Sequence, residues 1–471
     1  MRSLSLRWHV SVAAVVVALA GCSAMPTAPV LSTSAAPGTA LSGAETAARV
    51  TVHGPQGVAS STAEAATLGA VRSEGRAALV THHLGVLAAQ GEVDLYRGNA
   101  ARLLVDGPAT FGAMKAAIAR AKGRVMLESY IVEDAGVAAE FADLLLRKAS
   151  QGLSVALLYD AVGSLASEAA FFDRLAAGGV AVCKFNPINP LERPGAWGIN
   201  HRDHRKLLVV DDEVAFTGGI NISQVYSSGS SGRNRARSVD ALKEGWRDTQ
   251  IELRGPVVAA LARTFTATWV EQGCPGTLAP VRALPASAGQ RVVQVLASDP
   301  RDASNRIYTT MLAAVRASRV SVHLTMAYFA PGDDMVQALC DAALRGVDVR
   351  LVLPGTSDAV LVLHAGRSYY RKMLDAGVRL YEMEHANLHA KTAVIDGVLA
   401  TVGSSNMDWR SFVANSEINV VVLGDDFGQQ VETLFERDAA ASKPIDAQTW
   451  EQRPLRQRLL ERVGRAVEGL L

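Results

Sequence analysis

The sequence predicts an α/β fold built from two copies of one unit, and three observations lead to this prediction. The octets HRKLLVVD at 204–211 and HAKTAVID at 389–396 share the spacing H-x-K-x-x-x-x-D. Each octet follows a segment in which helix-like and strand-like patterns alternate. The chain has 471 residues, of which 49% are hydrophobic, enough for two ordinary cores or one large one. A duplicated α/β unit satisfies all three observations.

The N-terminus has the pattern of a secretory signal. Arg2 and Arg7 precede the apolar run VSVAAVVVALAG, which is too short for a comfortable membrane span. The run ends in L-A-G-C at Cys22, which resembles the lipobox of bacterial lipoproteins. We expect a signal peptide over residues 1–21 and a lipidated Cys22 that holds the protein on a membrane. Ser23 favours the outer membrane under the sorting rule for Gram-negative lipoproteins; a signal peptide with a chance cysteine is the alternative.

The following segment and the other cysteines fit an extracytoplasmic protein. Residues 22–81 are rich in Ala, Ser, Thr, Gly and Pro, which predicts a flexible tether between the lipid and the folded part. Outside the cytoplasm, an odd thiol among Cys183, Cys274 and Cys340 must stay buried or pair, and the sequence leaves that pairing open. The cysteine spacing matches no zinc site, so we expect no metal.

The helix and strand patterns of the folded part occur twice. A helix and a strand in AIARAKGRVMLESYIVED, and again in EFADLLLRKASQGLSVALLYD, form a βα unit. The same pattern occurs again in AAVRASRVSVHLTMAYFAP and MVQALCDAALRGVDVRLVLPGTSD. There Tyr328 corresponds to Tyr130, and Gly346 corresponds to Gly152. We therefore divide the folded part into residues 82–280 and 281–471, which we expect to pack as one pseudo-twofold body.

Each octet places a phosphate-binding pair of side chains together. Residues two apart on a strand share a face, so His204 lies beside Lys206, whereas Asp211 points to the opposite face and serves structure at the strand end. An imidazole next to an ammonium suits a phosphate. The full set of candidate catalytic motif residues is His204, Lys206, Asp211, His389, Lys391 and Asp396.

A hairpin after each octet brings a glycine-rich strand end back to the histidine. The segments GGIN and GSSN end in Asn221 and Asn406, each seventeen residues after its histidine. We expect both amides to bind phosphoryl oxygens. A lone strand histidine is more often structural, but two matched sets favour one shared site. Displacement at a phosphodiester uses two imidazoles, a neutral one that attacks and a protonated one that donates to the leaving oxygen.

The paired motifs resemble the phospholipase D superfamily over nearly all of residues 90–450. The strings LESYIVED, GGINIS, WRDTQIELRGPVV, LHAKTAVID and GSSNMDWRSFVANSEIN are similar to those of its bacterial cardiolipin synthase branch. The resemblance implies two mixed sheets flanked by helices, with the active site at the pseudo-twofold interface of the repeats. It also implies that His204 is the nucleophile of a phosphohistidine intermediate and that His389 is the general acid and then the base. The lysines and asparagines would hold the phosphate, while Asp248 and Glu417 would orient the histidines.

The resemblance implies a phosphatidyltransferase that makes cardiolipin from phosphatidylglycerol, and the N-terminal pattern predicts that it is membrane-anchored and faces the periplasm. We expect no cofactor, because the lysines already supply positive charge. Hydrolysis to phosphatidic acid, a nuclease and a non-catalytic lipid-binding protein are the alternatives. A net charge of +1 gives no global attraction to nucleic acid, so we expect a phospholipid substrate and no nucleic-acid partner. The oligomeric state is left open.

Two further segments suggest contact with a membrane. The loop SSGSSGRNRARS carries Arg233, Arg235 and Arg237, which would meet anionic head groups or belong to a solvated loop. The C-terminal segment LRQRLLERVGRAVEGLL has an apolar side made of Leu455, Leu459, Val463 and Leu470. It predicts a helix that caps the core, the more usual role, or an interfacial helix.

Overall fold

The computed structural model describes residues 39–60, 69, 76–192, 198–230, 245–281, 284–301 and 305–471. The chain divides into a unit of Met1–Ser32 and a unit of Thr33–Leu471, and the architecture below is that of the second unit. The predicted signal peptide and Cys22 lie outside the described residues, as do Arg233, Arg235 and Arg237.

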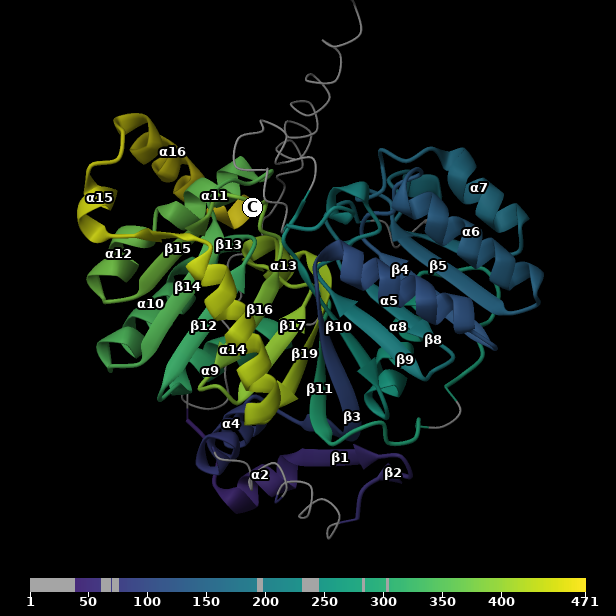
Figure 1. Ribbon diagram of the computed structural model, residues 1–471, viewed down its shortest axis with the longest axis horizontal. Helices are drawn as coiled ribbons and strands as arrows, with labels where there is room; N and C mark the ends of the chain where they lie inside the picture. Colours follow the sequence, from purple (N-terminus) through teal and green to yellow (C-terminus); the bar gives the residue numbers. More distant parts are fainter. Residues whose placement is uncertain are drawn as a thin grey trace, which may run out of the picture. The chain divides into compact units, whose positions relative to one another are not determined.

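Among the described residues, eighteen strands join into one mixed sheet (Figure 1). Its first half has the strand order β6 (Ala181–Phe185), β5 (Ser154–Asp160), β4 (Arg124–Ser129), β8 (Leu207–Val210), β9 (Val214–Gly218) and β10 (Thr249–Arg254). Its second half has the order β15 (Arg379–Met383), β14 (Asp348–Pro354), β12 (Ser321–Met326), β16 (Lys391–Ile395), β17 (Leu399–Gly403) and β19 (Asn415–Leu423). In both halves the first three strands are parallel and the other pairings are antiparallel.

The long strand β3 (Val93–Val105) joins the two halves, which corrects the prediction of two sheets. Its residues 100–105 pair with β10, while Tyr96 and Asn99 pair with β11 (Arg291–Ser298). Strand β11 in turn pairs with β19. Because one strand of 13 residues is long enough to hydrogen-bond to both halves in succession, the backbone ladder is continuous.

Helices cover both faces of the sheet, and the hairpin strands that follow the histidines, β8 with β9 and β16 with β17, are buried along their whole length. The first half carries α5 (Asp106–Arg120), α6 (Val137–Ser150) and α7 (Ala169–Ala177), and the second half carries α9 (Arg306–Ala317), α10 (Gly332–Leu344), α11 (Val360–Arg367) and α12 (Tyr370–Asp375). Helices α8 (Val257–Glu271) and α14 (Asp425–Ala440) pack into one hydrophobic cluster that contains side chains of both halves. The matched glycines Gly152 and Gly346 follow α6 and α10 with φ of +84° and +89°, a helix-ending conformation that suits glycine.

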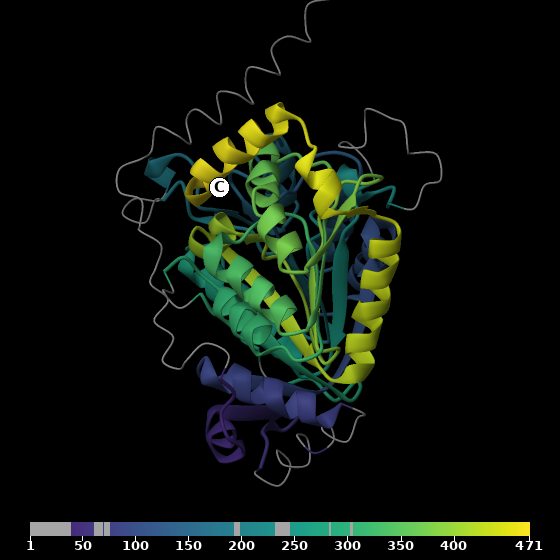
Figure 2. The ribbon, with the colours of Figure 1, turned by 90° about the vertical axis from the view of Figure 1, so that its left-hand side faces the viewer.

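Part of the predicted tether is folded, which corrects that prediction for residues 43–58. Helix α2 (Gly43–Arg49) begins at a capping box of Ser42 and Glu45, and β1 (Val50–Gly54) pairs with β2 (Gly57–Val58) and, in parallel, with β3. Helix α4 (Ala77–Ala89) follows. Val50 and Val52 alternate with less buried neighbours, so this strand gains free energy by covering the sheet edge. Figure 2 shows these elements together at one end of the unit.

The remaining elements are short and lie around the histidines or at the C-terminus. They are β7 (Arg202–Asp203), β13 (Phe329–Ala330), β18 (Met407–Asp408), α13 (Trp409–Val413), β20 (Lys443–Ile445), α15 (Ala447–Glu451) and α16 (Leu455–Ala466). A disulfide joins Cys183 to Cys274, and the Cys340 thiol is buried. None of the described helices has the length and apolar character that crossing a bilayer requires.

Candidate active site

His204 and His389 lie just before strands β8 and β16, where the two halves of the molecule meet. The short strand β7 pairs in parallel with Asn415 and Ser416 of β19, and the His204 amide donates to the Ser416 carbonyl at 2.9 Å. On the other side, the His389 amide donates to the Arg247 carbonyl at 2.8 Å. Each histidine backbone is therefore fixed by the opposite half.

Each imidazole is also paired with a carboxylate from the opposite half. His204 Nδ1 lies 3.0 Å from Oε1 and 3.1 Å from Oε2 of Glu417, whereas His389 Nδ1 lies 2.8 Å from Oδ2 of Asp248. A carboxylate on Nδ1 fixes the ring orientation and leaves Nε2 for chemistry. The structure thus places both predicted orienting residues at histidines, and the pairing is crossed.

Burial sets the charge state of these groups. Burial lowers the pKa of His204 well below its usual value, and the positive charges of Lys206 and Lys391 lower it further. Burial and Lys391 also lower the pKa of His389, while Asp248 opposes this effect. Burial raises the pKa of Glu417 to about 7. A phosphodiester anion between the imidazoles would offset the lysine charges and favour a protonated ring.

The two motif lysines are buried beside their histidines. Lys206 Nζ donates to the His204 carbonyl at 2.5 Å and lies 5.3 Å from the ring centre of Tyr130. Lys391 Nζ lies 2.9 Å from His389 Nδ1 and also donates to the His389 carbonyl. Burial lowers the pKa of Lys206 to about 7 and that of Lys391 to about 8. Near neutral pH the site therefore holds cationic charge that titrates readily.

The glycine-rich strand ends also reach the site. Gly219 lies against the Asp248 carboxylate, where a Cβ atom would collide with it. Asn221 accepts from the Ile131 amide at 3.1 Å and donates to the Tyr226 hydroxyl at 3.3 Å. The Oδ1 atom of Asn406 is buried and, among the described residues, has no hydrogen-bond partner.

The motif aspartates lie at the far ends of β8 and β16 from the histidines. Asp211 accepts from three consecutive backbone amides before β4, at 2.7–2.9 Å. Asp396 does the same before β12, at 2.7–3.0 Å, and its carboxylate lies 2.9 Å from His83 of α4. The structure gives both the structural role expected from their position on the strand, and does not bring them to the histidines.

Several aromatic and hydroxyl groups at the site had no role assigned from the sequence. The Tyr226 hydroxyl lies 3.1 Å from His389 Nδ1, and Ser404 donates to Glu417 at 2.5 Å. Tyr130 packs edge-on against His204 and Tyr328 against His389, with ring centres 5.1 and 5.9 Å apart. The matched positions of Tyr130 and Tyr328 in the two halves were the sequence signal that could have placed these two residues at the site.

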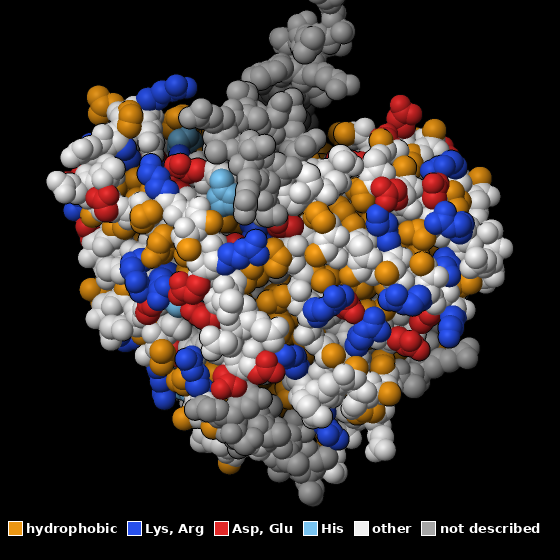
Figure 3. All heavy atoms as spheres, in the orientation of Figure 1, with side chains coloured by type: hydrophobic (Ala, Val, Ile, Leu, Met, Phe, Trp, Pro, Cys, Tyr) orange, Lys and Arg blue, Asp and Glu red, His pale blue; other side chains and the backbone are white. Residues whose placement is uncertain are grey.

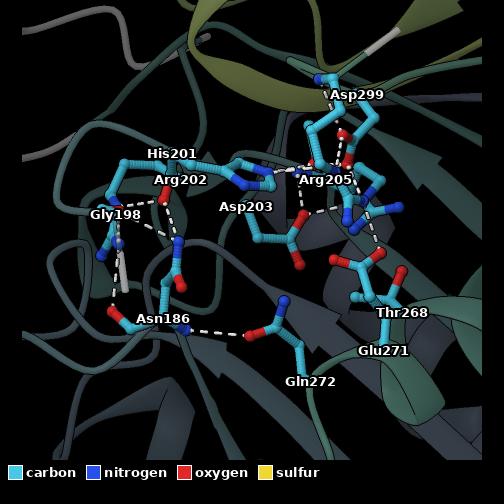
Figure 4. Close-up of polar contacts among 12 residues, drawn as sticks. Asn186, Gly198, His201, Arg202, Asp203, Arg205, Thr268, Glu271, Gln272 and Asp299 are labelled. Atoms are coloured by element: carbon cyan, nitrogen blue, oxygen red, sulfur yellow. Dashed lines mark hydrogen bonds and ion pairs between the residues drawn. The ribbon is translucent and has the colours of Figure 1, made fainter. Parts of the chain in front are cut away.

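A third histidine, His201, supports the His204 side of the site, and its ring points toward Asp299, 3.6 Å away (Figure 4). His201 Nε2 also lies 2.9 Å from the hydroxyl of Ser416, which donates to Asp299 at 3.1 Å. Ser416 directly precedes Glu417, so this chain of hydrogen bonds holds the strand that presents the carboxylate. Next to it, Arg202 forms a buried ion pair with Asp160 at 3.5 Å. His201 and Arg202 belong to the run HRDHRK, but the sequence does not show that they contact Ser416 and Asp160.

No cluster of three or more His, Cys, Asp or Glu side chains that could hold a metal ion occurs among the described residues.

Comparisons with known proteins identify the family. Residues 311–439 match the family described as "Cardiolipin synthase, PLD-like domain". The chain is 35% identical to a cardiolipin synthase of Geobacillus thermodenitrificans over 392 residues, which are 83% of this chain and 75% of that protein. It is 34% identical to cardiolipin synthase A of Pseudomonas syringae, over 81% of this chain and 77% of that protein.

The chain belongs to the cardiolipin synthase family of the phospholipase D superfamily. The resemblance seen in the sequence is thereby confirmed. The fold of this family member is similar to a phosphatidylserine synthase of Haemophilus influenzae, with a TM-score of 0.58 at 14% identity, over 79% of this chain and 95% of that one. The predicted α/β class is confirmed as well, with one large mixed sheet in place of the two that were expected.

Proposed function

We propose that the protein forms cardiolipin by moving a phosphatidyl group from one phosphatidylglycerol to a hydroxyl of another. The observation that carries this proposal is the crossed pairing, in which each half supplies one histidine and the carboxylate that orients the other. Two imidazoles that each face a carboxylate with Nδ1, so that Nε2 is directed to the reaction, are what a two-step displacement at phosphorus requires. Membership of the cardiolipin synthase family supports the choice of lipid substrate.

In the first step, Nε2 of neutral His204 attacks the donor phosphorus. The bond between phosphorus and the glycerol oxygen breaks, and protonated His389 gives its proton to that oxygen. Free glycerol leaves, and a phosphatidyl group remains on His204. The lowered pKa of His204 supports its role as the attacking group, because the ring stays neutral.

In the second step, a hydroxyl of the acceptor lipid attacks the same phosphorus. His389 takes the hydroxyl proton, the phosphorus–nitrogen bond breaks, and cardiolipin leaves. Lys206 and Lys391 neutralise the phosphoryl oxygens in both steps, and the amides of Asn221 and Asn406 complete the oxygen pocket. Asp248 and Glu417 hold the two rings in place.

This scheme assigns the site to an interface between two phospholipase D-type repeats, residues 82–280 and 281–471. The identical strand order of the two halves supports the duplication.

We also propose that a signal peptide over residues 1–21 exports the chain and that a lipid on Cys22 anchors it, facing the periplasm, in the outer membrane. The disulfide between Cys183 and Cys274 supports an oxidising compartment.

The test uses the full chain in detergent with phosphatidylglycerol, with lipid products read by mass spectrometry beside a His204→Ala control. We expect cardiolipin and free glycerol, both absent from the control. Excess glycerol should drive the reaction backward. Phosphatidic acid as the sole product would replace the transferase with a hydrolase, and no lipid product would overturn the lipid substrate.

A further inference from the structure

Helix α16 packs on the protein with its polar side and turns its apolar side outward. Leu455, Leu459 and Val463, spaced four residues apart on one stripe, are 81%, 61% and 44% exposed. A helix that merely caps a core would bury such a stripe. This finding contradicts the capping role expected from the sequence.

The inward side of α16 explains this orientation. Gly464 lies so close to α11 that a Cβ atom there would come within 2.6 Å of the Ala365 nitrogen. The buried Glu461 forms an ion pair with Arg453 at 2.7 Å. A close approach at glycine and a satisfied buried carboxylate hold the helix in place, so its leucines are free to contact something else.

The exposed side of α16 is also cationic. Arg456, Arg458 and Arg462 are exposed, and within the described part of the chain no carboxylate pairs with them. The acidic residues of this segment, Glu461 and Glu468, are buried and already bound to arginines. Figure 3 shows hydrophobic and basic side chains together over this corner of the molecule.

The helix is connected to the catalytic end of the unit. After α16, the carbonyl of Leu471 accepts from the Arg410 amide at 2.8 Å. Arg410 belongs to α13, four residues after Asn406, and its charge contributes to lowering the pKa of His204. A surface that binds α16 therefore lies near the end of the molecule where the histidines are.

We propose that the exposed stripe of α16 docks on an anionic phospholipid bilayer. The stripe from Leu455 to Val463 is about 12 Å long, and its leucines would enter the boundary between head groups and acyl chains. The arginines beside it complement anionic head groups, which selects a lipid surface over a neutral partner. This inference rests on the proposed function for its purpose: a lipid on Cys22 would hold the protein near a bilayer, and α16 would orient the site towards it.

The test measures flotation of the full chain, carrying Cys22→Ser to prevent acylation, with vesicles of equal parts phosphatidylglycerol and phosphatidylcholine. We expect the triple variant Leu455→Ser/Leu459→Ser/Val463→Ser to bind these vesicles at least about tenfold more weakly than the parent chain. Arg456→Glu/Arg462→Glu should abolish the preference for these vesicles over pure phosphatidylcholine. Leu344→Ser and Val270→Ser change residues that are 70% and 73% exposed elsewhere, so they should float like the parent chain.

Turnover separates this inference from the proposed function. Cardiolipin formation from phosphatidylglycerol in detergent should be the same for the triple variant and the parent, whereas formation on vesicles should fall. Loss of flotation in a chain that makes no cardiolipin would retain the docking surface and reject the function. Unchanged flotation of the triple variant would overturn the docking surface, as would a parent chain that forms dimers through α16 and does not float.

Discussion

The two histidine sites share a backbone frame but differ in what surrounds it. At His204, the residue before the orienting carboxylate is Ser416, held by His201 and Asp299. At His389, the corresponding residue is Arg247, whose guanidinium binds Asp438 at 2.6 and 2.9 Å. The crossed hydrogen bonds therefore match in the two halves, while the supporting side chains differ.

The charges around the two rings differ as well. His389 Nδ1 is approached by Asp248, Lys391 and the Tyr226 hydroxyl, whereas His204 Nδ1 is approached by the two oxygens of Glu417. The pKa of His204 lies well below its usual value, and Asp248 partly offsets the lowering at His389. The two rings thus lie in unequal electrostatic surroundings, which supports the unequal roles proposed for them.

The largest expected effect comes from removing either imidazole. We expect His204→Ala and His389→Ala each to lower kcat by about a thousandfold or more, because both half-reactions need both rings. Rapid denaturation at neutral pH and intact-protein mass spectrometry should detect a phosphatidyl adduct that maps to His204 in the parent chain and is absent from His204→Ala. An adduct that maps to His389 would exchange the two roles.

The orienting carboxylates should have the next largest effect. Glu417→Gln and Asp248→Asn keep the size of the side chain but remove the charge, and we expect each to lower kcat by about 10- to 100-fold with little change in KM. Steady-state kinetics on phosphatidylglycerol in detergent measures this. Equal losses in the two variants would mean that the Glu417–His204 and Asp248–His389 contacts contribute equally. An unchanged kcat in either variant would contradict the orienting role of the carboxylate that was replaced.

The pH profile of kcat/KM should sharpen the comparison further. As pH rises, Lys206 with a pKa of about 7 and Lys391 with a pKa of about 8 lose their charge, so activity should fall on the alkaline side by about tenfold per pH unit for each of the two charges that is lost. As pH falls, the Glu417 carboxylate, with a pKa of about 7, becomes protonated. It then has no negative charge with which to hold the His204 ring. We expect a bell-shaped profile whose acid limb weakens in Glu417→Gln. A flat profile from pH 5 to 9 would contradict the paired-histidine scheme.

The smallest effect is expected at His201, which acts through Ser416. We expect His201→Ala to lower kcat by a few-fold to about tenfold at unchanged KM, because the strand that presents Glu417 loses one support. His201→Asn, which keeps a polar group, should restore part of the loss, and the acid limb should shift only in the alanine variant. An effect on KM alone would remove His201 from the positioning residues.

Much of the site could be predicted from the sequence because its parts are local. The His-x-Lys spacing and the glycine-rich strand ends fall within seventeen residues of each other, so a short hairpin must bring them together. The positions of Asp211 and Asp396, seven residues after each histidine, also predicted their structural role. Tyr226 and His201 were missed because nothing in their local pattern shows that they contact His389 and Ser416.

The sequence alone determined the duplicated motifs, the α/β class and the family. Those properties depend on periodicity and spacing, which are local. Only the tertiary structure decided that Glu417 serves His204 and Asp248 serves His389, that β3 joins the two halves into one sheet, and that Cys183 pairs with Cys274. It also decided that α16 turns its leucines outward, because which side of a helix is buried depends on the surface against which it packs.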